Sequence, residues 1–267
     1  MKIIDAHLHI FPNNNSATAA CEAESLAGLR RLCESTGIIH GIVMGNRSLA
    51  VGYHNYPTDL LHYCIGLDSR MLDYNKSAPL DLADQVEENL KQENCCGIKL
   101  YPGYNKVSLS APLYLPIYEL AQFYKKPVAV HMGLTAFPRA HLKYCHPLAL
   151  DETAADHPGV SFVMCHFGNP FLESAAAVLV KNPNVSADLS GLLEDPVDLD
   201  AWFREQSGYA ALLRTWLAAS NCWDRFLYGS DWPIVSPENY INFIRRLIPP
   251  VHWEAVFCEN ARRVYGL

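Results

Sequence analysis

The sequence has no long hydrophobic run, no run of basic residues and no cysteine pair with Cys-x-x-Cys spacing. A membrane span needs about 20 consecutive apolar residues, and no segment approaches that length. Without a basic stripe the chain cannot neutralise a row of phosphates, so we do not expect nucleic acid or an anionic membrane as a partner. Nine cysteines without that spacing indicate neither a disulfide framework nor a thiolate zinc site.

The amino terminus also lacks the features of a secretory signal. Met1 leads directly into an apolar run, without the ordered charged region, long apolar stretch and cleavage site of such a signal. Because we also interpret the cysteines as reduced thiols, we expect a cytoplasmic protein. The net charge of -7 is spread thinly, which favours a small-molecule substrate, and the oligomeric state, including a homo-oligomer, stays open.

The chain instead alternates short apolar runs with longer stretches of helical spacing. Eight runs rich in β-branched residues separated in this way are typical of a parallel sheet with crossover helices. We therefore predict one α/β domain over residues 1–267, a (β/α)8 barrel of the TIM type. A doubly wound sheet is less favoured, because the turn at residues 11–15 has no glycine to bind a pyrophosphate.

The predicted elements can be placed by residue number. The strands are predicted at residues 3–7, 39–44, 61–67, 97–100, 128–131, 161–165, 185–188 and 226–228. The helices are predicted at residues 22–34, 80–93, 115–124, 148–156, 173–180, 209–218, 238–247 and 253–264. The link at residues 50–58 is the weakest candidate for a full helix.

Two histidines end the first predicted strand with a spacing of two. Side chains on a strand alternate between its faces, so His7 and His9 are expected to point to the same side. Two imidazoles on one rigid strand can converge on a divalent ion such as zinc. Alone, the pair is more often two surface or core histidines, so its meaning depends on the rest of the chain.

Polar residues also lie at the ends of other predicted strands. His131 ends the fifth, His166 the sixth and Asp231 the eighth, while Lys99 lies within the fourth. A barrel gathers the carboxyl ends of its strands around one axis. Because a charged group in a buried strand is costly unless it is paired or bound to metal, these positions predict a shared site.

These segments resemble the amidohydrolase superfamily, and most closely its amidohydrolase-related (amidohydrolase 2) branch of metal-dependent hydrolases and nonoxidative decarboxylases. The motifs that carry the resemblance are Asp-Ala-His-Leu-His at residues 5–9, Gly-Ile-Lys-Leu-Tyr-Pro at 97–102, the two strand-ending histidines, and Gly-Ser-Asp-Trp-Pro at 229–233. The resemblance implies a distorted TIM barrel with one divalent ion, most often Zn²⁺. Its implied ligands are His7, His9, His131 and Asp231.

The resemblance leaves two side chains with open roles. His166 would lie beside the metal as an acid/base group or as a ligand of a second ion. Lys99 would either be carbamylated and bridge two ions or act as a cation facing the substrate, and we favour a single metal. Asp5 is expected either to accept a hydrogen bond from a metal-binding imidazole or to serve as a hydrogen-bonding group at the strand end.

Contacts with the substrate are harder to predict. Arg47 and Arg139 could clamp a carboxylate by paired hydrogen bonds, although surface arginine is the commoner outcome. Tyr101 and Trp232 could wall an aromatic substrate or serve packing alone. The further candidates on the same rim of loops are Tyr104 and His54, with His141 and His146 as weaker ones.

The expected function is hydrolysis of a small amide, lactone or ester by a metal-activated water. Asp231 would accept the proton, and His166 would stabilise the oxyanion or act as the acid. The alternative is metal-dependent nonoxidative decarboxylation of a small, aromatic carboxylic acid, which the ligands alone do not separate from hydrolysis. A third hypothesis, a binding protein with a structural metal, is less favoured because such a site is usually closed by four ligands without a spare acid/base group.

Overall fold

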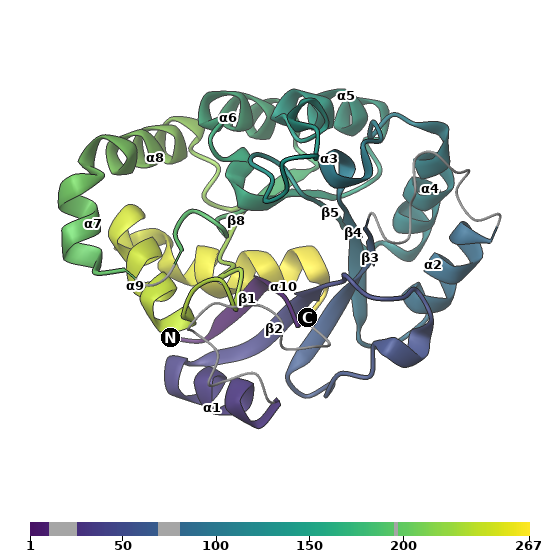
Figure 1. Cartoon of the computed structure of the whole chain (residues 1–267), viewed down its shortest axis with the longest axis horizontal. Coiled ribbons are helices and arrows are strands. Elements are labelled where there is room, and N and C mark those ends of the chain that lie inside the picture. The colour runs from purple at the N-terminus through teal and green to yellow at the C-terminus, as the bar shows by residue number, and fades with distance from the viewer. Residues whose placement is uncertain (11–25, 69–80, 195–196) are drawn as a thin grey trace.

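The computed structural model of the chain describes residues 1–10, 26–68, 81–194 and 197–267. Among these residues, eight parallel strands pair in chain order from β1 to β8. A bridge between Leu8 and Trp232 and a hydrogen bond from Ala6 N–H to the Tyr228 carbonyl join the last strand to the first. The predicted TIM-type barrel is therefore confirmed, with helices surrounding the strands (Figure 1).

Each predicted strand overlaps an observed one. Several observed strands end one or two residues before the polar residue that was expected to end them, so His9, His131 and His166 lie just beyond the strands rather than within them. The strands are β1 (Ile3–Leu8), β2 (Ile38–Met44), β3 (Leu61–Leu67), β4 (Cys95–Leu100), β5 (Val128–Val130), β6 (Phe162–Met164), β7 (Val185–Asp188) and β8 (Phe226–Leu227).

The helices follow the prediction with three differences. The link at residues 50–58 holds only a 3-10 turn, Val51–Tyr53, and two short helices were not predicted, α3 (Pro102–Asn105) and α7 (Leu199–Glu205). The predicted helix at 253–264 contains a π-helical turn, Ala255–Glu259, before α10 (Asn260–Tyr265). Residues 22–25 and 80 lie outside the described residues. The other helices are α1 (Leu26–Thr36), α2 (Leu82–Leu90), α4 (Leu115–Tyr124), α5 (Pro147–Asp156), α6 (Leu172–Lys181), α8 (Ser207–Ser220) and α9 (Pro237–Leu247).

The helix ends have local causes in the sequence. The side chain of Asp198 accepts hydrogen bonds from the backbone of the first turn of α7, at Asp200 and Ala201. Proline occupies the first position of α5 and α9, where its missing N–H costs nothing. Helix α8 ends at Ser220, and Asn221 after it has the left-handed conformation that terminates many helices.

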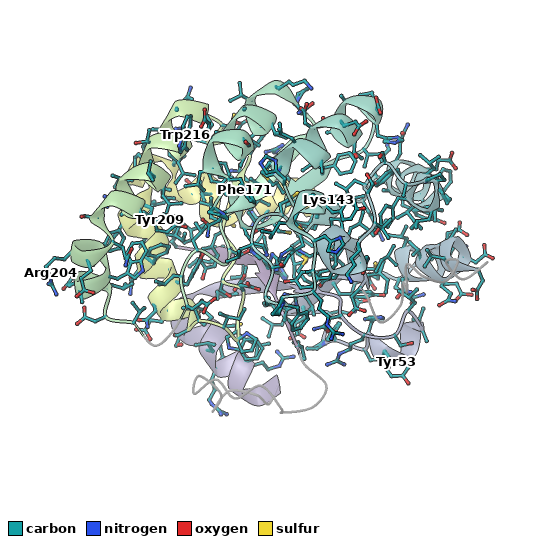
Figure 2. All side chains as sticks on the ribbon, turned by 45° about the horizontal axis from the view of Figure 1, so that its top comes forward. Tyr53, Lys143, Phe171, Arg204, Tyr209 and Trp216 are labelled. Carbon is teal, nitrogen blue, oxygen red and sulfur yellow. The ribbon has the colours of Figure 1, made fainter. Side chains whose placement is uncertain are left out.

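The core has two parts, one between strands and helices and one inside the barrel. On β4, Ile98 and Leu100 belong to the outer part, so Lys99 between them faces the barrel interior. Figure 2 shows the side chains of the outer helix layer, with Tyr209 and Trp216 of α8 labelled. Among the described residues, no helix is long and apolar enough to cross a membrane. The cytoplasmic location and the oligomeric state stay predictions.

Candidate metal centre and active site

The ends of β1 and β8 bring two histidines and an aspartate together. His7 Nε2 lies 3.5 Å and His9 Nε2 lies 3.3 Å from the same oxygen, Asp231 Oδ1. The pairing of β1 with β2 shifts register between Asp5 and Leu8, an irregularity of the kind that redirects side chains. The Asp231 N–H donates to the His7 carbonyl at 2.8 Å, which fixes the two strand ends to each other.

Hydrogen bonds on the outer side of each ring determine which nitrogen is protonated. His9 Nδ1 lies 3.1 Å from the Met44 carbonyl, and His7 Nδ1 lies 3.0 Å from Asp188 Oδ2. Because both partners only accept hydrogen bonds, each Nδ1 carries the hydrogen and each Nε2 of the neutral ring is unprotonated. Two nitrogen lone pairs therefore face a carboxylate oxygen.

The unprotonated nitrogens and the carboxylate oxygen form a set of atoms that fits a divalent cation. His7 Nε2 and Asp231 Oδ1 are buried and have no hydrogen-bond partner. Buried polar atoms are nearly always partnered, and neither atom here can donate a hydrogen to the other. A metal ion between them would satisfy both, and neutral imidazole with carboxylate is a ligand set that zinc accepts.

His131 and His166 form a second pair beside this group. His131 Nε2 donates to the Leu134 carbonyl at 3.0 Å, which leaves its Nδ1 unprotonated and 3.1 Å from His166 Nε2. The ring of His166 also lies 4.9 Å from that of His7, centroid to centroid. Possible ligand atoms of His7, His9 and Asp231 thus lie within 4.8 Å of one another, with His166 and His131 beside them, and the binding of a metal by His131 stays a prediction.

Burial sets the protonation states of these groups. It lowers the pKa of His7 to about 4, and it lowers the pKa of His131 and of His166 as well. Burial alone would raise the pKa of Asp231, but the neighbouring His7 and His9 outweigh it and hold that pKa well below its usual range. Neutral imidazoles and an ionised carboxylate are the forms that bind a cation at neutral pH.

Asp188 is the functional residue that sequence reasoning missed. It ends β7, is buried, and accepts the hydrogen of His7 Nδ1. Of the two roles expected for Asp5, the structure shows hydrogen bonding at the strand end: its side chain accepts hydrogen bonds from the backbone of His7 at 3.2 Å and of Ser230 at 2.9 Å, and so joins β1 to β8. The strand-end rule that selected the histidines would also have selected Asp188, since it ends the predicted strand at 185–188.

Lys99 lies deeper in the barrel. Its ammonium donates to Cys165 Sγ at 2.7 Å, and Nζ lies 5.3 Å from the centre of the Tyr101 ring. A second group of possible ligand atoms, from His7, Cys165 and Asp188, gathers at this depth. The ammonium beside the thiol disfavours a cation there, because two positive charges would share one buried site. Both alternatives for Lys99, the less favoured bridge between two ions and a cation facing the substrate, stay predictions.

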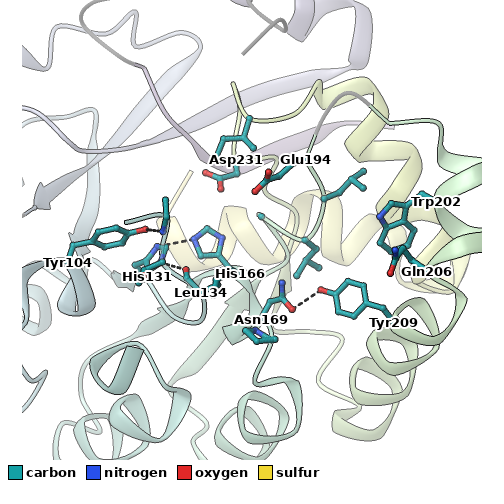
Figure 3. A pocket seen from close by; sticks show the side chains of 17 residues that line it. Tyr104, His131, Leu134, His166, Asn169, Glu194, Trp202, Gln206, Tyr209 and Asp231 are labelled. Carbon is teal, nitrogen blue, oxygen red and sulfur yellow. Dashed lines mark hydrogen bonds between the residues drawn. The ribbon is translucent and has the colours of Figure 1, made fainter. Parts of the chain in front are cut away.

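Two adjoining cavities open onto the histidines and Asp231. The first measures about 430 Å³ and is also walled by Tyr101 and Phe137. The second measures about 580 Å³ and extends toward α7 and α8, where Trp202, Gln206 and Tyr209 line the end away from His131 (Figure 3). The residues shared by both are Tyr104, His131, Ala136, His166, Asp231 and Ile234.

Of the four residues predicted to contact substrate, Tyr101 lines a cavity and the others do not, as far as the described residues define the cavity walls. The Arg47 guanidinium donates to the carbonyls of Ile10 at 3.2 Å and Tyr53 at 3.4 Å, and so holds loop backbone. Arg139 is exposed. Trp232 is buried, and its carbonyl accepts from the His9 N–H at 2.7 Å.

Among the further candidates on the rim of loops, one lines the cavities and three make contacts elsewhere. Tyr104 lines both cavities. His54 lies 2.8 Å from the Ser48 carbonyl through Nε2 and stacks on Tyr63, away from the metal centre. His141 stacks on Tyr144, and His146 accepts from the Leu148 N–H at the start of α5.

Comparison with known proteins shows the family of the chain. Residues 4–267 match the family model Amidohydro_2, described as amidohydrolase. The chain belongs to this amidohydrolase family. No curated protein matches it. The family match covers the motifs on which the resemblance was based, and the strand-end residues described above lie within it.

Solved structures share the fold over their full length. An uncharacterised TIM-barrel protein from Bordetella bronchiseptica is 19% identical, with a TM-score of 0.75 and coverage of 100% of this chain and 99% of that one. An amidohydrolase from Burkholderia multivorans with bound HEPES is 17% identical, with a TM-score of 0.72 and full coverage of both chains, and another crystal form of it holds zinc. The 2,6-dihydroxybenzoate decarboxylase from Rhizobium is 15% identical, with a TM-score of 0.67 and coverage of 100% and 99%.

Proposed function

We propose that the chain is a metal-dependent hydrolase that cleaves an amide, lactone or ester bond in a small substrate. The observation that carries this proposal is the meeting of unprotonated His7 Nε2 with Asp231 Oδ1, both buried without a hydrogen-bond partner, beneath two cavities. His7, His9, His131 and Asp231 would hold the ion, for which zinc is the best candidate. When bound, such an ion lowers the pKa of a water ligand from about 15.7 toward about 7 and polarises a carbonyl group.

The residues around the centre supply the proton transfer. Asp231 is ionised at neutral pH because the neighbouring histidines hold its pKa below the usual range against the effect of burial. It can therefore accept the proton of the attacking water and return it to the leaving group. His166 borders both cavities and would act at the substrate side of the centre.

The cavity walls favour hydrolysis over decarboxylation. Among the described residues that line the two cavities there is no lysine or arginine, whereas Asp68, Glu194 and Asp231 are acidic. Apart from the ion itself, a substrate carboxylate would find no cationic partner among these described wall residues, so an uncharged lactone, ester or amide fits them better. The aromatic side chains of Tyr101, Tyr104 and Phe137 could pack against a ring in such a substrate.

Parallel assays of the zinc-loaded protein test this proposal. One set offers dihydrocoumarin, phenyl acetate and a simple anilide and follows acid release in a pH-stat. The other offers 2,6-dihydroxybenzoate and measures carbon dioxide. We expect acid release from at least the lactone, lost when zinc is removed by a chelator. Carbon dioxide release without hydrolysis of any ester or lactone would overturn the proposal in favour of the decarboxylase.

A further inference from the structure

Ser190, two residues beyond the end of β7, occupies the centre of a polar network below the cavities. Its side chain is fully buried. The hydroxyl oxygen lies 2.9 Å from His166 Nδ1 and 3.1 Å from His7 Nδ1, and it also contacts Asp188 Oδ1. A single serine therefore touches both a proposed metal ligand and the histidine beside it, and the proposed reaction assigns it no role.

Asp188 fixes the direction of the serine hydroxyl. The carboxylate receives the hydrogen of His7 Nδ1 on one oxygen, and on the other the N–H of His166 at 3.0 Å and the N–H of Ser190 at 3.1 Å. An ionised carboxylate can only accept, so the one hydrogen of the Ser190 hydroxyl must also point to Asp188. Toward both histidines, the Ser190 oxygen can then only accept.

This direction determines the tautomer of His166. Because His166 Nδ1 faces an oxygen that only accepts, Nδ1 carries the ring hydrogen. In the neutral ring, Nε2 is then unprotonated. It faces Nδ1 of the proposed ligand His131, which is unprotonated for an independent reason, because His131 Nε2 donates to the Leu134 carbonyl. Two lone pairs 3.1 Å apart repel each other unless a cation or a proton lies against them.

The backbone conformations of His166 and Gly191 allow the His166 ring to contact Ser190. His166 has φ of 61°, a left-handed conformation that non-glycine residues rarely adopt, and its N–H is held by Asp188. Gly191 has φ of 63°, and a Cβ there would lie 2.6 Å from His166 Nδ1. A larger residue at 191 would collide with the His166 ring, so only glycine fits there. The ring reaches Ser190 even though the backbone of His166 adopts an uncommon conformation.

We propose that Ser190 is a positioning residue that, together with Asp188, holds His166 in its Nδ1–H form. His166 then presents Nε2 to the metal centre as an acceptor, available to a metal ion or a proton, and not as a hydrogen-bond donor to an oxyanion. One carboxylate thus sets the tautomers of two histidines, His7 directly and His166 through the serine. The catalytic consequence rests on the proposed hydrolase function, whereas the tautomer does not.

NMR of the zinc-loaded full chain, labelled with ¹⁵N in its histidine rings, tests the tautomer. A long-range proton–nitrogen spectrum distinguishes protonated from unprotonated ring nitrogens, and loss of one ring's signals in His166→Gln assigns His166. We expect Nδ1 protonated and Nε2 unprotonated. In Ser190→Ala the ring should shift wholly or partly to the Nε2–H form, whereas Ser190→Thr, which keeps the hydroxyl, should retain the original pattern.

Ser186→Ala is the matched control, because Ser186 is a buried serine of β7, the strand that Ser190 follows, and makes no hydrogen bond to any described histidine. Its His166 signals should equal those of the wild type. The proposal would be overturned by a protonated His166 Nε2 in the wild type, or by an unchanged His166 tautomer in Ser190→Ala. If Ser190→Ala fails to fold, the wild-type spectrum alone tests the tautomer.

Activity measurements separate this proposal from the hydrolase function. With dihydrocoumarin, Ser190→Ala should lower kcat by about 10- to 100-fold, the effect typical of residues that orient a metal-site histidine, and Ser190→Thr should restore most of it. A wild-type protein that hydrolyses no lactone would contradict the hydrolase function and leave the tautomer result standing. An active Ser190→Ala with wild-type kcat would contradict the positioning role.

Discussion

The two halves of the barrel rim are built in different ways. At the ends of β1, β7 and β8, polar side chains meet, and Asp188 and Asp231 each engage more than one histidine. At the ends of β2 and β3, backbone packs on backbone: a Cβ on Gly66 would overlap the Gly45 carbonyl, which also accepts from the Tyr101 hydroxyl at 2.9 Å. We call the rim at β1, β7 and β8 the polar half, where the contacts depend on which atoms carry protons. We call the rim at β2 and β3 the packed half, where the contacts depend on close packing of the backbone.

This difference predicts where a change of charge without a change of size will matter. In the polar half, replacing a carboxylate by an amide alters proton positions and should reduce activity while the fold persists. In the packed half, removing a hydroxyl should cost some stability and leave the chemistry intact. The following substitutions and conditions test that contrast.

The largest effect is expected for Asp231→Asn. The amide cannot accept the proton of the attacking water, so kcat with dihydrocoumarin should fall by about 10²- to 10⁴-fold, the usual contribution of a general base. Thermal unfolding followed by circular dichroism should remain close to that of the wild type, and metal analysis should find part of the zinc retained. Wild-type kcat in this variant would remove Asp231 from the proton-transfer role.

Asp188→Asn should have the next largest effect. The amide leaves either His7 Nδ1 or the Ser190 hydroxyl without its acceptor, and residues that orient metal-binding histidines are worth about 10- to 100-fold in metal affinity or activity. Zinc titration and kcat are the measurements. Asp151→Asn is the control, because Asp151 pairs with Lys181 on the outer helices and should change neither value. Equal effects of the two substitutions would show that Asp188 has no special role.

The polar half should also dominate the acid sensitivity of the metal-free protein. The pKa of His7 is about 4 when folded and near 6.5 when unfolded, so the unfolded chain binds more protons between these values. The free energy of unfolding should therefore fall as pH decreases from 6.5 to 4, by on the order of 3 kcal/mol from His7 alone. Urea unfolding in a chelator across this range measures it, and His7→Gln should flatten the slope. An unchanged slope in that variant would contradict the buried neutral His7.

The smallest effect is expected for Tyr63→Phe, on β3 below the packed half of the rim. This change removes the hydrogen bond from the Tyr63 hydroxyl to Asn89 Oδ1, 3.0 Å long, and should lower the free energy of unfolding by about 1 kcal/mol. Zinc binding and kcat should match the wild type, because Tyr63 lies on β3 and packs against His54 rather than against the metal centre. A loss of zinc here would break the division between the two halves.

The sequence predicts this fold well because its signals are local and repeated. Apolar runs alternate with helical stretches, and each predicted strand overlaps an observed one, but the short helices α3 and α7 lie within loops where no such period is available. The histidines at 7 and 9 could be proposed from spacing and motif alone. Asp188 was missed because it belongs to no motif. Its position at the end of a predicted strand nevertheless carries the same information as the strand-end positions of the histidines.

Contacts that depend on loop paths or on the barrel interior could not be predicted. Arg47 lies after β2, where an arginine can face the cavity or hold backbone, and only the fold shows that its guanidinium meets the carbonyls of Ile10 and Tyr53. The partner of Lys99, Cys165, lies two strands away around the barrel. The role of Ser190 likewise requires the relative positions of three strand ends.

Anomalous diffraction at the zinc edge, from crystals of the zinc-loaded protein, tests the metal centre most directly. We predict one strong peak at about 2.0 to 2.2 Å from His7 Nε2, His9 Nε2 and Asp231 Oδ1, the distances usual for zinc with nitrogen and oxygen ligands. The absence of a peak there, or a peak at the deeper group of Cys165 and Asp188 instead, would contradict the assignment of this centre.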